Sequence, residues 1–194
     1  MLNLKMAAAA LGILLVAACS KSRKKDTPQP AYSYRSLNNV EVRNLKPYFL
    51  DMNDDDEFDV YFIVGVVNDQ EGTHAKFAAV GTLASKVLSI PDSVFRLNEG
   101  DEIPVLPVHP QEWNALTPYF CELLLPAANP ADTTWRGSWV AASKKYMGVQ
   151  FRKGDDTFLG WVSLSVDTAR DCMVLHDYAW RHINAGSVKA GERQ

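Results

Sequence analysis

The fold is decided by residues 157–167, which read Thr-Phe-Leu-Gly-Trp-Val-Ser-Leu-Ser-Val-Asp. One set of alternate positions carries Phe158, Gly160, Val162, Leu164 and Val166. The other set carries Thr157, Leu159, Trp161, Ser163, Ser165 and Asp167. A period of two is typical of a β-strand, and Gly154 followed by two aspartates is typical of a hairpin turn. The run therefore predicts the second strand of a β-hairpin.

Further runs of the same kind predict an all-β protein. Residues 60–67 alternate between two mostly apolar faces, so we expect a central strand that is covered on both sides. Residues 119–125 and 172–180 form two more apolar runs, and turn residues follow one another at close spacing. The sequence contains no long amphipathic helical pattern. We therefore expect a single antiparallel β-sandwich of the jelly-roll or lectin type.

Length and charge limit the classes of function. The chain has 194 residues, which is enough for one domain with a sizeable core, and a formal net charge of −3. A mildly acidic chain argues against nucleic acid as a partner, because phosphate contacts need a basic surface. The sequence has no phosphate-binding loop, no Gly-x-Ser-x-Gly motif and no helical pair of zinc ligands. We expect a binding protein rather than an enzyme, although a hydrolase that uses two carboxylates would leave no linear motif.

The N-terminus resembles the signal of a bacterial lipoprotein. Residues 1–5 are basic, residues 6–18 are apolar or small, and the run ends in Val16-Ala17-Ala18-Cys19. Such a run is too short to span a bilayer. The resemblance implies that the signal peptide 1–18 is removed and that Cys19 carries palmitate and other acyl chains, which together anchor a protein stably. The alternative is an ordinary cleaved signal peptide in which the cysteine is incidental.

The same resemblance predicts where the protein lies and how it is divided. Ser20 follows the cysteine where aspartate would retain a lipoprotein in the inner membrane, so we expect an outer-membrane lipoprotein of the cell envelope. Residues 19–36 are polar and contain two prolines, which predicts a flexible tether after the lipid. We expect the folded domain to span residues 37–188 and a polar tail to span residues 189–194.

An acidic stretch precedes the strand at residues 60–67. Four oxygen-bearing side chains occupy positions 1, 3, 5 and 9 of a calcium-loop spacing, namely Asp51, Asn53, Asp55 and Asp59. Asp56 stands where such a loop has a glycine, and Phe62 stands where it has a bidentate glutamate. The stretch is therefore either a truncated calcium site or a solvated acidic hairpin tip.

Trp161 lies on the more polar face of its predicted strand, with Ser163 two positions further on. An exposed flat aromatic ring beside hydroxyl groups can stack on a sugar ring or on a protein partner. These two residues are therefore candidates for a ligand-binding surface. The alternative is a second core layer beneath a covering loop.

Two cysteines remain besides the one in the N-terminal signal. Cys121 and Cys172 lie in separate predicted strands. In an oxidising compartment the two can form a disulfide that links the middle of the chain to a C-terminal strand. The alternative is two buried thiols.

The C-terminal third resembles a family of exported bacterial β-sandwich proteins that includes lipoproteins of the Bacteroidetes type. The resemblance rests on Gly160-Trp-Val, His176-Asp-Tyr-Ala-Trp and Ile183-Asn-Ala-Gly, and on the acidic stretch before a Phe-containing strand. Ser163 departs from the basic residue that is usual in that pattern. The resemblance implies no catalytic residues. We therefore expect a lipid-anchored module that binds a glycan or an envelope protein, or else a structural subunit of an envelope assembly.

Overall fold

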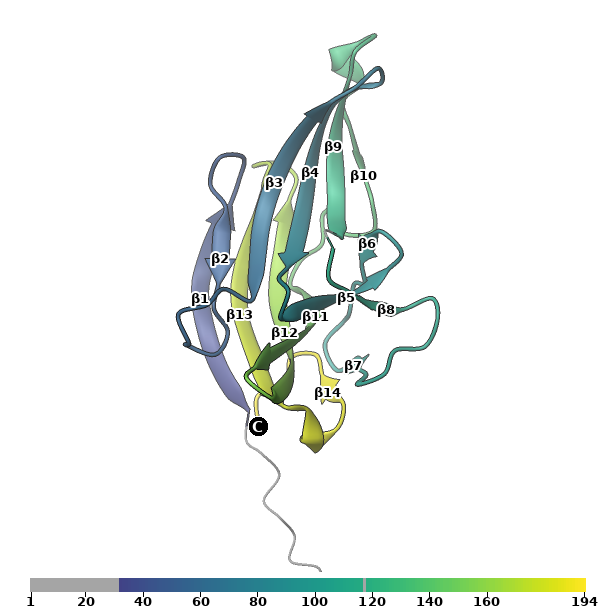
Figure 1. Ribbon diagram of the computed structural model, residues 1–194. Coiled ribbons are helices and arrows are strands. Elements are labelled where there is room, and N and C mark those ends of the chain that lie inside the picture. The colour runs from purple at the N-terminus through teal and green to yellow at the C-terminus, as the bar shows by residue number, and fades with distance from the viewer. Residues whose placement is uncertain (1–31, 117) are drawn as a thin grey trace, which may run out of the picture.

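The computed structural model describes residues 32–116 and 118–194 (Figure 1). Within these ranges the protein is all-β and contains no α-helix, so the all-β part of the predicted fold class is confirmed. None of the helical turns in this part of the chain is long and apolar enough to cross a membrane. The predicted signal peptide 1–18 and the predicted lipidation site Cys19 lie outside the described residues.

The elements follow one another with short connections. In chain order the strands are β1 (Ser33–Val42), β2 (Tyr48–Leu50), β3 (Val60–Asn68), β4 (Gly72–Gly81), β5 (Ser85–Ile90), β6 (Ser93–Val94), β7 (Glu102–Ile103), β8 (Glu112–Asn114), β9 (Tyr119–Pro126), β10 (Thr134–Arg136), β11 (Lys145–Lys153), β12 (Asp156–Asp167), β13 (Cys172–His182) and β14 (Val188–Lys189). Two 3-10 turns, η1 (Pro130–Asp132) and η2 (Ile183–Ala185), complete the list.

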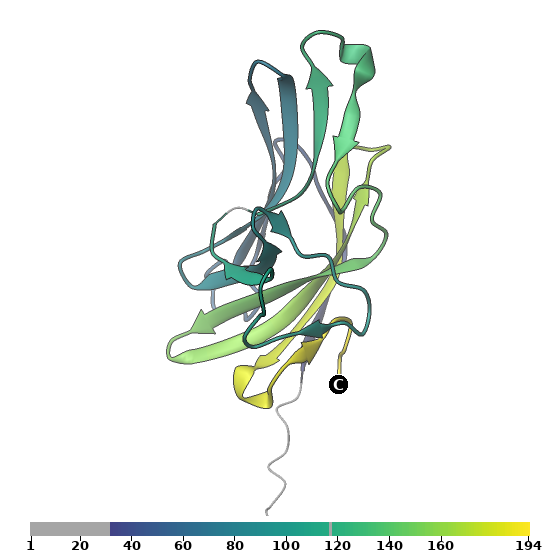
Figure 2. The same ribbon diagram turned by 90° about the vertical axis from the view of Figure 1, so that its right-hand side faces the viewer.

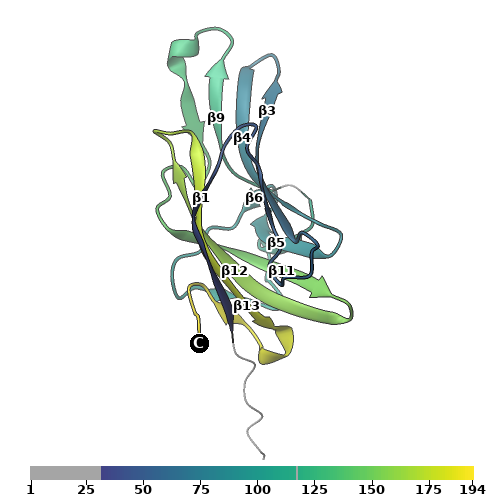
Figure 3. The ribbon, with the colours of Figure 1, turned by 90° about the vertical axis from the view of Figure 1, so that its left-hand side faces the viewer.

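Hydrogen bonds join twelve strands into one sheet with the order β1-β13-β12-β11-β5-β6-β9-β4-β3-β2, while β8 pairs with β5 and β10 pairs with β9. All of these pairs are antiparallel except β6 with β9. The sheet curls until it is nearly closed into a barrel, and the β11–β12 hairpin is steeply inclined to β3 and β4 (Figures 2 and 3). A sandwich of two separate sheets is not confirmed, because the strand path is continuous.

The main core fills the inside of the curled sheet. It contains buried side chains from most strands, including Val60, Phe62, Phe77, Phe120, Phe151, Val162, Leu164 and Met173. The Phe120 ring stacks on Phe62 with a centroid distance of 6.3 Å, and Trp139 meets it edge-on at 4.9 Å. The buried indole N–H of Trp139 donates to the backbone carbonyl of Val94 over 2.9 Å, so that its one polar atom has a partner.

A second, smaller core lies on the other face of β12. It contains the buried residues Leu88, Leu97, Ile103, Tyr146, Leu159, Trp161, Ala179, Val188 and Ala190. The covering residues come from the segment between β6 and β9 and from the C-terminal segment after η2. Because both of its faces are covered, the middle of β12 is buried on both sides of the sheet.

The two ends of the described chain belong to the folded domain. β1 begins at Ser33, before the expected domain start at residue 37, and its first residues pair with β13. In the predicted polar tail, Lys189 pairs in β14, Ala190 is buried and Arg193 contacts Asp177 at 2.6 Å. Residues 33–36 and 189–193 therefore belong to the folded domain, because Tyr34 and Ala190 pack in the second core, while residues 19–31 of the predicted tether lie outside the described residues.

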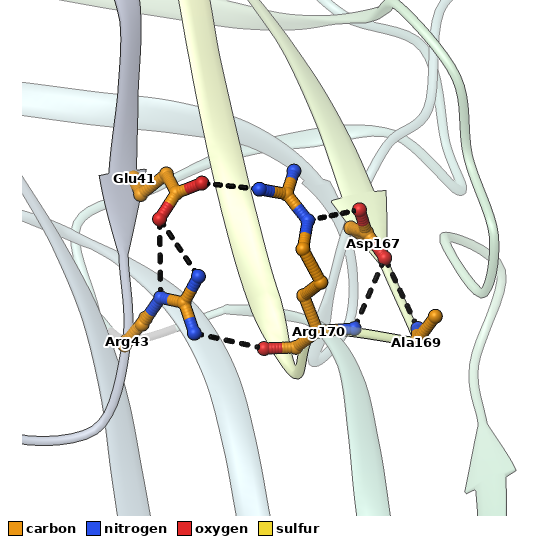
Figure 4. A network of polar contacts seen from close by, with 5 residues as sticks. All are labelled: Glu41, Arg43, Asp167, Ala169 and Arg170. Atoms are coloured by element: carbon orange, nitrogen blue, oxygen red, sulfur yellow. Dashed lines mark hydrogen bonds and ion pairs between the residues drawn. The ribbon is translucent and has the colours of Figure 1, made fainter.

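An ion-pair network holds the edge strand β1 against the β12–β13 hairpin (Figure 4). Glu41 of β1 pairs with Arg43 at 2.7 Å and also with Arg170, which lies in the hairpin turn. Arg170 pairs in turn with Asp167 at 2.7 Å, and Asp167 accepts the backbone N–H groups of Ala169 and Arg170. These side chains are partly exposed, so each single pair contributes little to stability, but together they hold the edge strand against the hairpin turn.

A substitution of Gly160 tests how tightly β12 packs against β13. A Cβ atom at this position would lie 2.4 Å from the carbonyl oxygen of Ala179 and 2.8 Å from the Cβ of Trp180. We expect Gly160→Ala to lower the free energy of unfolding, measured by urea denaturation, by about 1–3 kcal/mol. Gly65→Ala in β3 is the matched control, because the described residues place no other atom within 4 Å of the added carbon. Equal losses in both variants would contradict the close packing of β12.

Candidate ligand-binding groove

The predicted ligand-binding residues Trp161 and Ser163 are buried. Trp161 is 0% exposed, its indole N–H donates to the carbonyl of Glu192 over 3.0 Å, and Tyr146 packs edge-on against it at 5.3 Å. Ser163 is also fully buried and donates its hydroxyl hydrogen to Asp177. The expectation of a ligand surface at these two residues is therefore wrong, and the alternative of a second core layer is confirmed.

The two described cysteines are free and buried. Cys121 lies in β9 and Cys172 begins β13, and no disulfide joins them in the described chain. Burial, with the charge of Glu122 adding to it, raises the pKa of the Cys121 thiol to about 12. Burial also raises the pKa of Cys172. The possible disulfide is therefore replaced by two protonated, unreactive thiols.

The acidic loop is a hairpin tip that its own carboxylates hold together. Asp51 accepts the backbone N–H groups of Asn53, Asp55 and Asp56 over 3.1, 3.3 and 2.9 Å. Asp56 adopts the left-handed conformation with φ of 66°, at the position where a calcium loop has a glycine. In the described part of the chain, no group of three or more His, Cys, Asp or Glu side chains is arranged to hold a metal ion. This geometry favours the acidic hairpin tip, and calcium stays a prediction.

The acidic loop also forms one wall of a groove of about 540 Å³. Its lining residues are Asp55, Asp56, Glu57, Phe58, Asp59, Tyr61, Thr82, Leu83, Ala84 and Arg152. A second groove of about 320 Å³ shares the last three of these and adds Lys86, Gln150 and Thr157. The continuous surface is therefore acidic and aromatic at one end and carries cations, an amide and a hydroxyl at the other.

Three aromatic rings stand beside the acidic wall. Phe49 of β2 and Tyr61 of β3 are opposite one another in the strand register, with ring centroids 5.2 Å apart. Phe58 from the loop lies 5.4 Å from Phe49 and 6.1 Å from Tyr61. Phe49 and Phe58 remain 47% and 49% exposed, so much of their apolar surface contacts water. A clustered exposed aromatic surface marks a place where a ligand or partner binds.

Asp59 stands apart from the other carboxylates of the loop because it is buried. Burial raises the pKa of its carboxyl to about 6, a hydrogen bond from the Met52 backbone N–H opposes this rise, and the charges of Asp55, Asp51 and Glu57 add to it. Its neighbours in the groove wall are more exposed to solvent. The groove therefore contains one carboxyl that exchanges a proton near neutral pH.

The acidic stretch was visible in the sequence, but the groove was not. The aromatic rings beside it come from three segments, and their contact depends on the pairing of β2 with β3. Tyr61 lies between the buried residues Val60 and Phe62, but the apolar composition of both faces of β3 predicted a covered strand and did not indicate that Tyr61 is partly exposed.

Comparisons with known proteins give neither a family nor a function for this chain. The chain matches no protein family, no curated protein and no solved structure. The chemistry of the groove therefore rests on its own residues.

Asp59→Asn tests the raised pKa through stability. The carboxyl has a pKa of about 6 in the folded protein and an ordinary value of 3.8, so folding favours its protonated form. Its stabilising contribution is complete below about pH 4 and is lost as the pH rises through 6. Asparagine stays neutral and can still accept the Met52 N–H. We therefore expect the wild type to lose roughly 2–3 kcal/mol relative to the variant between pH 4 and pH 7 in urea denaturation. A constant difference across this range would contradict the raised pKa.

Proposed function

We propose that this protein is a lipid-anchored binding module of the bacterial outer membrane, and that its ligand site is the groove beside the acidic loop. The lipoprotein-like sequence around Cys19 supports the location. The observation that carries the site is the exposed ring cluster of Phe49, Phe58 and Tyr61 next to a carboxylate wall. The all-β framework holds both on paired strands and on a loop fixed by Asp51.

A glycan is the ligand class that this surface fits best. Sugar rings present C–H faces that stack on aromatic rings, and their hydroxyl groups donate to carboxylates. The acidic wall offers Asp56 and Glu57 as acceptors, and both are exposed. The adjoining groove offers Arg152 and Gln150 as donors to ring and hydroxyl oxygens. One oligosaccharide could therefore contact rings, carboxylates and donors along the continuous surface.

A second candidate function follows from Asp59. A buried carboxyl with a raised pKa beside further carboxyl groups is the arrangement that glycoside hydrolases use for a general acid and its partner. Asp55 and Glu57 line the same groove as Asp59. Cleavage of a bound glycan that is lost in Asp59→Asn, while binding is retained, would favour a hydrolase over a binding module.

The structural alternative is a subunit that packs in an envelope assembly. In that case the ring cluster would contact protein rather than sugar. Crosslinking from the groove in intact cells, followed by identification of the attached molecule, separates the two: a protein adduct at Phe58 supports the subunit, and a glycan adduct supports the binding module.

Phe58→Ala tests the groove as the ligand site. We expect the detergent-solubilised lipoprotein to bind at least one glycan on an array, in buffers with calcium and with a chelator. For that glycan, calorimetry should show about a tenfold loss of affinity in the variant, since one aromatic contact contributes about 1 kcal/mol or slightly more. Leu106→Ala is the matched control, because Leu106 is 82% exposed but does not line the groove. Equal losses in both variants, or an array without any bound glycan, would count against the proposal.

Cys19→Ser tests the anchor. We expect the wild type to incorporate labelled palmitate and to sediment with membranes, and we expect the variant to do neither. Cys121→Ser with Cys172→Ser is the control, because both of these thiols are buried and this double variant should keep the label. Label that persists in Cys19→Ser would contradict the lipoprotein assignment.

A further inference from the structure

Two facing β-bulges bring a serine, a histidine and an asparagine together away from the groove. Between β12 and β13 the register passes from Ser163–Asp177 to Leu164–Leu175, which leaves His176 as an extra residue. Between β1 and β13 the register is interrupted from Ser36 to Val40, opposite the same place. Asn38 and Asn39 in this gap have left-handed φ values of 53° and 60°. Bulges of this kind re-aim side chains and are frequent beside active sites.

The three side chains form one hydrogen-bonded chain. The hydroxyl oxygen Oγ of Ser165 lies 2.7 Å from Nε2 of His176, and Nδ1 of His176 lies 2.7 Å from Oδ1 of Asn39. An amide oxygen can only accept, so Nδ1 carries the imidazole proton. Nε2 then has a free lone pair and accepts the hydroxyl hydrogen of Ser165. A nucleophile, a base and a group that orients the base are thus in the order that nucleophilic catalysis requires.

The surroundings of Ser165 suit a nucleophile. The backbone N–H of Lys144 donates to Oγ over 2.9 Å, which leaves one lone pair of the oxygen open. Ser165 and His176 are half-buried, whereas Asn39 and Lys144 are exposed, so the cluster lies at the surface. Burial lowers the pKa of His176, the charge of Asp177 opposes this and the charge of Lys144 adds to it. The imidazole is therefore neutral near pH 7 and can act as a base.

We propose that Ser165 is a nucleophile that accepts acyl groups from carboxylic esters, with His176 as general base and Asn39 as positioning residue. Oγ attacks the carbonyl carbon while its proton passes to Nε2. The bond from that carbon to the leaving alkoxide then breaks, and the alkoxide takes the proton from Nε2. Water follows the same route and releases the acid from the acyl-serine. None of the three residues lines the acidic groove, so this activity is independent of ligand binding there.

The test uses the full chain and a fluorophosphonate probe linked to biotin. Oγ attacks the phosphorus atom, fluoride leaves, and the hydroxyl proton passes through Nε2 to solvent. We expect one phosphonyl group per chain in the intact mass, and peptide mapping should place it on Ser165. In parallel, p-nitrophenyl butyrate should release p-nitrophenolate. The proposal is overturned if the wild-type protein stays unlabelled under conditions that label trypsin. This holds irrespective of the results with the variants.

Single-residue variants test the role of each of the three side chains. We expect Ser165→Ala to lose the label, and His176→Gln to be labelled about 100-fold more slowly because the general base is gone. Ser143→Ala is the matched control in the segment just before β11, since Ser143 is an exposed serine, and its labelling should equal that of the wild type. Asn39→Ala should slow labelling, and Asn39→Asp should restore it, because a carboxylate also accepts the Nδ1 proton. Equal rates in His176→Gln and the wild type, or no rescue by aspartate, would refute these roles.

Discussion

Both faces of β12 are buried, and the rest of the structure depends on this constraint. One face packs in the main core through Val162 and Leu164, and the other places Trp161 in the second core. Burial of an indole side chain is worth roughly 4–6 kcal/mol by area. This gain requires a cover, because no neighbouring strand of a curled sheet can shield its outer face. The segment between β6 and β9 and the C-terminus supply that cover, and Glu192 provides the acceptor for the indole N–H.

The same covering segments also stabilise a buried carboxylate, that of Asp177. Asp177 is buried and accepts hydrogen bonds from Ser163, from the hydroxyl of Tyr34 at 3.1 Å and from Arg193 at 2.6 Å. A buried charge is costly unless it is paired and hydrogen-bonded. The partners come from β12, from the start of β1 and from the C-terminal segment. One carboxylate thus ties both ends of the described chain to the sheet, which explains why residues that look like a tether and a tail belong to the domain.

The alternation of residues 157–167 was enough to predict the hairpin and the all-β class, because the period of two is a local property. Whether a side chain is exposed to solvent, by contrast, is not a local property of the sequence. Ser163 suggested a solvated face, yet its partner Asp177 and the cover over Trp161 come from distant segments. In β3 the sequence predicted burial where the structure shows exposure. Its apolar composition predicted a central strand, but β2 pairs with only Val60 to Phe62. Val66 and Val67 beyond it are 45% and 54% exposed. Hydropathy predicts burial only where the fold supplies a partner.

The geometry of the two candidate sites is harder to predict from the sequence than the strands are. The ring cluster at the groove needs the register that sets Phe49 opposite Tyr61. The chain from Ser165 to Asn39 needs two irregularities at one point of the sheet. In a regular strand, residues 176 and 177 would point to opposite faces. The extra residue in β13 lets Asp177 reach Ser163 while His176 reaches Ser165, and both serines lie on the same face of β12. A shift of one residue in this register would separate imidazole and hydroxyl, so the bulge itself holds the base beside the nucleophile.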